Sequence, residues 1–111
     1  MSPPLDPQLR ARFEARANVV KALAHATRLA LVDELSRGER CVCDLHQRVG
    51  GDLSTVSKHL SVLKSAGVVV DEKRGVQVFY RLRVPCITSF FTCIEGVLRA
   101  TAEEKVAVLA R

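Results

Sequence analysis

Residues 41–82, CVCDLHQRVGGDLSTVSKHLSVLKSAGVVVDEKRGVQVFYRL, decide the fold of this 111-residue chain. A short apolar-periodic segment runs from Cys41 to Val49, and two consecutive glycines end it. A second helical segment follows, with Asp52 as its N-cap and Gly67 as its stop. Two helices joined by a tight glycine break are typical of a helix-turn-helix, which we predict over about residues 42–66.

The pattern then changes from helices to strands. β-rich runs at 68–70 and 76–80 flank the charged segment 71–75, which ends in a glycine. This arrangement predicts a β-hairpin over about residues 68–82, with a charged turn between short strands. A hairpin directly after a helix-turn-helix is a wing, so the predicted fold is mainly α with a β-hairpin wing.

Helical patterns flank this region on both sides. The first runs from Asp6 or Pro7 to about residue 24, and the second begins at Ala26-Thr27 and ends before Gly38. Pro85 suits the first turn of a fifth helix over about residues 85–100, and Thr101 suits the cap of a short last helix. The whole chain, residues 1–111, is therefore expected to form a single winged helix-turn-helix domain.

Composition narrows the class of protein. The chain has 17 Lys and Arg against 12 Asp and Glu, a formal net charge of +5, which favours an acidic polymer such as double-stranded DNA as partner. No signal peptide and no bilayer-spanning run is apparent, so we expect a cytoplasmic protein without a membrane partner. The sequence shows no nucleophile–base arrangement, phosphate loop or catalytic metal motif, so we do not expect an enzyme.

The second helix of the helix-turn-helix is the predicted DNA-reading element. Its apolar positions fall on one side, and short hydroxyl and basic side chains occupy the rest, near the end that meets the major groove. The wing adds basic and amide side chains beside it. The predicted DNA-binding residues are Ser54, Thr55, Ser57, Lys58, His59, Lys73, Arg74 and Gln77.

Three segments resemble the ArsR/SmtB family of metalloregulatory repressors. Residues 35–45, LSRGERCVCDL, resemble the cysteine box of its arsenic-responsive branch, residues 57–69 its recognition helix, and residues 73–82 its wing. The resemblance covers roughly residues 17–98. It implies a homodimer that pairs through the first and fifth helices, binds an imperfect palindrome in its own promoter, and leaves it when As(III) or Sb(III) binds.

The chain departs from the family pattern in its ligands. The position of a third cysteine in the arsenic box is occupied by His46. The cadmium and lead branch has an additional N-terminal cysteine, but here no cysteine precedes Cys41. The zinc-ligand positions of the fifth helix are occupied mainly by Val84, Cys86 and Val97, so that zinc site is not expected.

Cys41 and Cys43 are the predicted inducer ligands. Thiolates select soft ions, and the start of a helix favours the thiolate form. Residues i and i+2 of a regular helix point about 200° apart. Both sulfurs can therefore bind one ion only if Cys41 lies outside the helix or the first turn unwinds. Either change would disturb the helix before the recognition helix, which couples ion binding to DNA release.

The third ligand stays open at this point. His46 shares a face with Cys43 but suits zinc or copper better than As(III). Cys86 and Cys93 are the other candidates, predicted on one face of the fifth helix, where two-fold symmetry could build two intersubunit sites. The alternative functions are a redox- or persulfide-sensing repressor and a repressor that senses another soft metal such as Cd, Pb or Zn.

Overall fold

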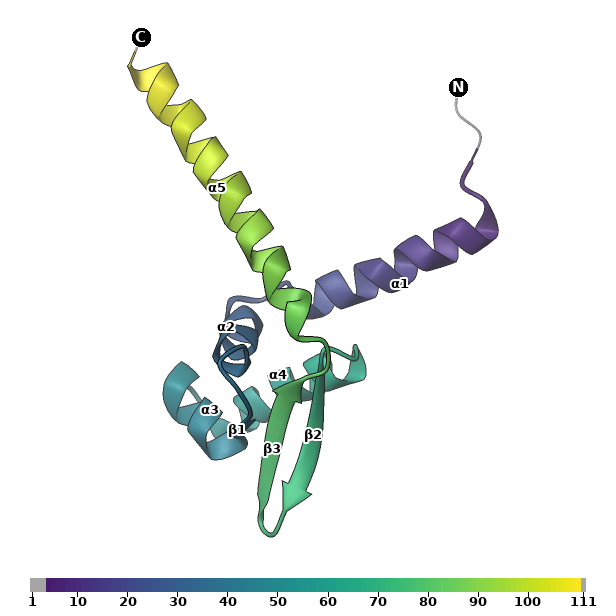
Figure 1. Ribbon diagram of the computed structural model, residues 1–111, viewed down its shortest axis with the longest axis vertical. Coiled ribbons are helices and arrows are strands. Elements are labelled where there is room, and N and C mark those ends of the chain that lie inside the picture. Colours follow the sequence, from purple (N-terminus) through teal and green to yellow (C-terminus); the bar gives the residue numbers. More distant parts are fainter. Residues whose placement is uncertain (1–3, 111) are drawn as a thin grey trace.

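The computed structural model describes residues 4–110, as a small body from which two long helices project (Figure 1). Along the chain the elements are α1 (Pro7–Leu23), α2 (Ala26–Leu35), β1 (Arg40–Cys41), α3 (Val42–Val49), α4 (Leu53–Ser65), β2 (Val69–Arg74), β3 (Gln77–Leu82), the 3-10 helix η1 (Pro85–Ile87) and α5 (Thr88–Leu109). The predicted helix-turn-helix is α3–α4, and the predicted wing is β2–β3.

The core lies between α2, α3, α4 and the sheet. Its largest fully buried side chains come from these elements alone: Leu31, Val32, Leu45, Val56, Leu60, Leu63 and Val69. Burial of a leucine or valine side chain stabilises the fold by about 1.5–3 kcal/mol. This shared core fixes the helix-turn-helix and the wing relative to each other.

The turn between α3 and α4 depends on its two glycines. Gly50 and Gly51 have φ values of +75° and +78°, a region that other residues rarely adopt. Asp52 occupies the predicted N-cap position of α4 with extended backbone, but its side chain makes no capping hydrogen bond. A ring nitrogen of His46 lies 2.7 Å from the Gly51 carbonyl oxygen and ties α3 to this turn.

The wing differs from the predicted hairpin in its turn. The charged residues 71–74 were expected in the loop, but they belong to β2, and only Gly75 and Val76 connect it to β3. Gly75 supplies the positive φ of +62° that a two-residue turn needs. The strands of the wing are therefore longer, and its turn shorter, than the sequence suggested.

A third strand, β1, pairs with the wing and was not expected from the sequence. In strand β1, Arg40 pairs with Tyr80 and Cys41 with Phe79, both antiparallel. The strand order is β1-β3-β2. Main-chain pairing thus links Cys41 directly to β3, the wing strand at the centre of the sheet.

The C-terminal helix also corrects two expectations. It continues without a break to Leu109, and Thr101 does not cap a separate helix, because its hydroxyl donates to the Val97 carbonyl at 2.9 Å within α5. Cys86 lies in η1 rather than in the fifth helix. The two cysteines therefore do not lie in one regular helix, and the shared face predicted from their seven-residue spacing does not follow.

Helices α1 and α5 project from the body in different directions (Figure 1). The radius of gyration is 17.8 Å, whereas a compact chain of this length would have about 13 Å. None of the residues of α5 is buried. None of the helices within residues 4–110 has the length and apolar character needed to cross a membrane.

Candidate nucleic-acid interface and cysteine site

Helix α4 has a buried face and a polar face, as predicted. Its inward residues Val56, Leu60 and Leu63 are at most 1% exposed. The hydroxyl and basic residues toward its N-terminal end are all exposed: Ser54, Thr55, Ser57 and Lys58. The helix therefore offers short donors, and Lys58 with no ion pair to the residues that the structure describes, on the side away from the core, as a helix that enters a DNA groove must.

His59 occupies the flank of α4 rather than this exposed face. It is half-buried, and its ring centroid lies 4.3 Å from that of His25. Burial lowers the pKa of His59, and the neighbouring charges of His25 and Arg28 lower it further. His25 Nδ1 in turn accepts the Thr27 N–H at 3.1 Å and caps α2. The histidine pair thus joins α4 to the start of α2.

The predicted wing residues have different surroundings. Lys73 and Gln77 are exposed on the two strands near the tip. The Arg74 guanidinium is bound by two carboxylates, since its Nη2 donates to Glu39 at 3.0 Å and to Glu72 at 2.8 Å. These hydrogen bonds, first that of Glu72 and then that of Glu39, raise the pKa of Arg74.

Arg74 also packs on an aromatic ring. Its guanidinium carbon lies 4.6 Å from the ring centroid of Phe79, a cation–π distance. Glu39 stands two residues before Cys41, and Phe79 is the strand partner of Cys41. The wing arginine and the first cysteine are therefore joined by one small cluster, which we call the Glu39–Arg74 clamp (Glu39, Glu72, Arg74 and Phe79).

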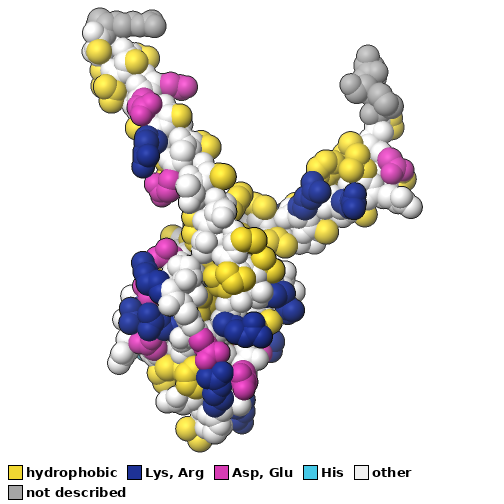
Figure 2. Space-filling model, viewed as in Figure 1, with side chains coloured by type: hydrophobic (Ala, Val, Ile, Leu, Met, Phe, Trp, Pro, Cys, Tyr) yellow, Lys and Arg dark blue, Asp and Glu magenta, His cyan; other side chains and the backbone are white. Residues whose placement is uncertain are grey.

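The surface charges are divided between paired and free groups. Arg37, Arg40, Arg48, Lys64 and Arg74 each form ion pairs with nearby carboxylates. The other described cations form no ion pair within residues 4–110: Arg10, Arg12, Arg16, Lys21, Arg28, Lys58, Lys73, Arg81, Arg83, Arg99 and Lys105. Figure 2 shows Lys and Arg side chains over the body of the molecule and on both projecting helices. Unpaired cations thus lie on the recognition helix and the wing, and also along α1 and α5.

Cys41 lies just outside α3, at its N-cap. Its backbone is extended, with φ −78° and ψ 159°, and its Sγ accepts the Asp44 N–H at 3.4 Å. This meets one of the two conditions for both cysteines to bind one ion. Cys41 is half-buried, and Cys43 is exposed in the first turn of α3.

A complete three-ligand site does not form within one chain. Among the residues that the structure describes, no three His, Cys, Asp or Glu side chains come together as metal ligands. His46 uses a ring nitrogen at Gly51, while Cys86 and Cys93 are exposed in η1 and α5, outside the α3 region. Cys41 and Cys43 are thus neighbours at the start of α3, and no third sequence-predicted ligand joins them among the described residues.

The two projecting helices carry exposed apolar side chains. On α1 these include Leu9, Phe13 and Val20, and on α5 Val97 is 65% exposed. Figure 2 shows hydrophobic side chains along both helices. Contiguous apolar surface of this kind marks an interaction site.

Comparison with known proteins gives consistent matches. The family model described as "Bacterial regulatory protein, arsR family" matches residues 25–70. The arsenical resistance operon repressor of Escherichia coli K12 is 38% identical over 92 residues, which cover 82% of this chain and 78% of that protein. The transcriptional repressor SmtB of Mycobacterium tuberculosis is 40% identical over 76 residues, 68% of this chain but 56% of that protein. The chain thus spans about half the length of that curated relative.

A solved structure extends the likeness to almost the whole chain. It is the homodimeric winged helix-turn-helix DNA-binding domain of Mb0332 from Mycobacterium bovis, described as a possible ArsR-family transcriptional regulator. The identity is 30% and the TM-score 0.76, and the match covers 93% of this chain and 95% of that one.

Proposed function

Because the chain belongs to the arsR family of bacterial regulatory proteins, we propose that it is a transcriptional repressor that As(III) or Sb(III) releases from operator DNA. The observation that carries the proposal is the position of the cysteine pair. Cys41 and Cys43 lie at the start of the first helix of the helix-turn-helix, and Cys41 is also a strand partner of the wing. A ligand bound there acts on both DNA-binding elements.

The DNA-binding form is a homodimer through α1 and α5. Both helices leave apolar side chains without cover, and the extended shape gives a second copy room to pack against them. The Mycobacterium bovis domain, which is similar over nearly the whole chain, is homodimeric. A two-fold dimer places two recognition helices on half-sites about one helical turn, roughly 34–36 Å, apart.

Helix α4 and the wing make the DNA contacts. Ser54, Thr55, Ser57 and Lys58 face the major groove, with His59 at their flank, while Lys73 and Gln77 of the wing meet the neighbouring backbone. Arg74 reaches DNA only if it leaves Glu39, because both carboxylates of the clamp now occupy it.

The inducer site has a donor set suited to soft thiophilic ions. Cys41 and Cys43 supply two thiolates, which as soft ligands select As(III) or Sb(III) over hard cations. A third ligand must come from elsewhere, and Cys86 or Cys93, of the same or the partner subunit, remain the candidates within this sequence.

Release follows from what Cys41 does in the ligand-free protein. Its Sγ caps α3 by accepting the Asp44 N–H, and its backbone pairs with Phe79. When the Cys41 thiolate binds the inducer ion instead of the Asp44 N–H, α3 loses this cap and β1 shifts against β3. Because α3 packs against α4 in one core, the recognition helix and the wing lose their relative position.

A redox or persulfide sensor is the second candidate, because two thiols without a third ligand are enough for it. Two cysteine thiols and hydrogen peroxide would give one disulfide and two water molecules. A labelled duplex that covers the promoter before the protein's own gene tests both. As(III) alone should release the protein from this duplex under reducing conditions. If only peroxide or polysulfide releases the protein, the redox or persulfide sensor replaces the As(III) proposal.

A further inference from the structure

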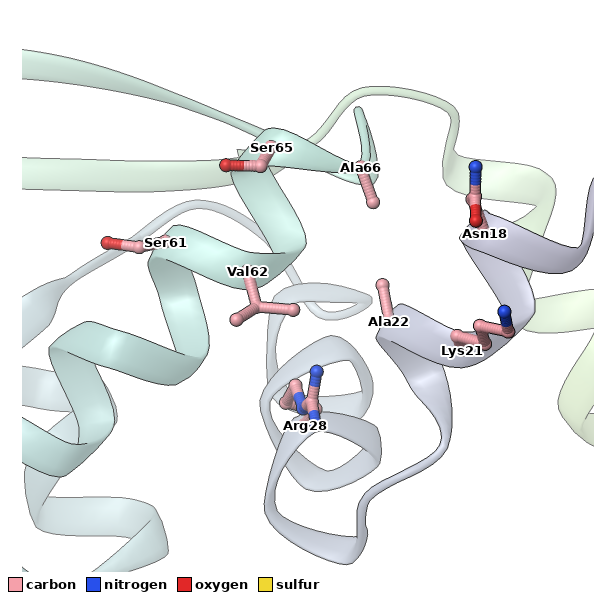
Figure 3. A pocket seen from close by; sticks show the side chains of 8 residues that line it. All are labelled: Asn18, Lys21, Ala22, Arg28, Ser61, Val62, Ser65 and Ala66. Carbon is pink, nitrogen blue, oxygen red and sulfur yellow. The ribbon is translucent and has the colours of Figure 1, made fainter. Parts of the chain in front are cut away.

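A hollow of about 460 Å³ opens to solvent where α1, α2 and α4 meet (Figure 3). Small apolar side chains, Ala22 and Val62, form its floor. Lys21 on α1 and Arg28 on α2 supply its charged side chains, whereas Ser61 and Ser65 on α4 lie at its rim with their hydroxyls pointing away from Arg28 (Figure 3). None of the residues that line this hollow is acidic.

The charge in this hollow has no partner within residues 4–110. Lys21 and Arg28 form no ion pair there, unlike the five paired cations described above. The Arg28 Nε is buried and has no hydrogen-bond partner. A buried donor that stays unpaired costs about 1–3 kcal/mol, so such groups point to a ligand or a water that satisfies the side chain. The N-terminus of α2 adds its positive dipole end.

The hollow is continuous with the proposed DNA-reading face. Ser61 and Ser65 follow Ser54 by seven and eleven residues, so the three share one face of α4. By helical rise, they lie about 10 and 16 Å further along the helix than Ser54. The major groove is about 12 Å wide, so a helix that reads bases near Ser54 brings these residues to the edge of the groove, where phosphates lie.

We propose that this hollow binds one phosphate of the operator backbone, beside the part of the groove that α4 reads. Arg28 donates its guanidinium hydrogens to the phosphate oxygens, and Lys21 adds a second positive charge. Ser61 and Ser65 lie on the adjoining face of α4, toward the groove, while the apolar floor faces the deoxyribose. The inference rests on the proposed function, because it assigns α1 and α2 a part in the same DNA complex.

The test is the salt dependence of DNA binding by full-length Arg28→Gln and Lys21→Gln proteins. Each dimer has two hollows, so loss of both phosphate contacts should flatten the log–log slope by about 1.8. Between 50 and 200 mM salt, the variant should therefore lose about tenfold less affinity than the wild type. Lys21 is exposed, so its variant keeps the test valid if Arg28→Gln unfolds.

Two controls separate the hollow from the rest of the interface. Arg37→Gln removes an already paired arginine near the opposite end of α2 and should leave the slope unchanged. Lys58→Gln on α4 should flatten the slope whether or not the hollow binds phosphate. If Lys58→Gln flattens it while Lys21→Gln and Arg28→Gln do not, the phosphate site is overturned and DNA binding stands. If the wild type shows no salt-dependent binding, the proposed function itself fails.

A second arm distinguishes DNA phosphate from a free anion. Inorganic phosphate replaces chloride at equal ionic strength, and the thermal unfolding of the DNA-free protein is followed. Whether or not phosphate stabilises the free protein, the proposal requires that Arg28→Gln also flatten the DNA salt slope. Stabilisation that Arg28→Gln abolishes, together with an unchanged DNA salt slope, would make the hollow a site for a free anion and overturn the DNA contact.

Discussion

Substitution of Cys41 separates its structural role from its role in induction. The Cys41 Sγ caps α3 at 3.4 Å, a long and weak hydrogen bond. Serine is a preferred N-cap, so Cys41→Ser should keep the helix and the DNA affinity. Cys41→Ala removes the cap and should cost about 0.5 kcal/mol. For a domain of this size, this lowers Tm by about 3 °C.

The effect on induction should be far larger and the same for both variants. Structural multi-thiolate zinc sites bind with about 10–16 kcal/mol, so one of three ligands is worth about 4 kcal/mol. Its loss raises the As(III) concentration needed for half-release about 1,000-fold. Cys43→Ala is the matched control, because Cys43 is exposed and caps nothing: it should lose the response without the loss of Tm.

Fluorescence anisotropy of the labelled promoter duplex, titrated with As(III), measures the response, and circular dichroism measures Tm. The reasoning is refuted if Cys41→Ser and Cys43→Ser dissociate at the wild-type As(III) concentration. If Cys86→Ser or Cys93→Ser loses the response while Cys41→Ser and Cys43→Ser keep it, the sensor lies in the C-terminal region instead.

Three further outcomes are expected. Lys73→Ala should flatten the salt slope of DNA binding by about 1.8 per dimer. Glu39→Gln should steepen the slope, because it frees Arg74 for phosphate. Equal slopes for the wild type and both variants would exclude contact between the wing and DNA. Val97→Asp should convert a dimer to a monomer in sedimentation at micromolar concentration without lowering the Tm of the monomer, and a persistent dimer would exclude this face. The lowered pKa of His59 means that protonation favours the unfolded chain. The contribution of His59 to stability is therefore full above pH 6.5 and falls as the pH drops below it. His59→Gln should weaken this fall in the free energy of unfolding, measured in urea between about pH 7.5 and 5.5.

Local patterns were enough to predict the helix-turn-helix. Val56, Leu60 and Leu63 recur at helical spacing, and all three are buried as that spacing requires. The Gly50-Gly51 break also has one structural meaning, because its positive φ values end α3. Such signals lie within a few residues of one another, so no tertiary information is needed to interpret them.

Contacts between distant segments left no comparable signal. Glu39 and Arg74 are 35 residues apart, and β1 has only two residues, too few for an alternating pattern. Thr101 was expected to cap a new helix, but in the continuous α5 its hydroxyl bonds to Val97. Arg28 could have been noted as a cation in the first turn of a helix, where an acidic residue is more favourable.

The position of Cys41 explains how a small ligand could oppose a large DNA interface. Cys41 lies at the N-cap of α3, outside α4, and its backbone pairs with Phe79, on which Arg74 stacks while it is hydrogen-bonded to Glu39. A shift of β1 therefore moves the central strand of the wing and the partner of its arginine together. Coupling of this kind is reciprocal and typically amounts to 5–150-fold in affinity. If As(III) is the inducer, as proposed, operator DNA must weaken As(III) binding by the same factor, so that the free protein binds the ion first and the operator is vacated by mass action.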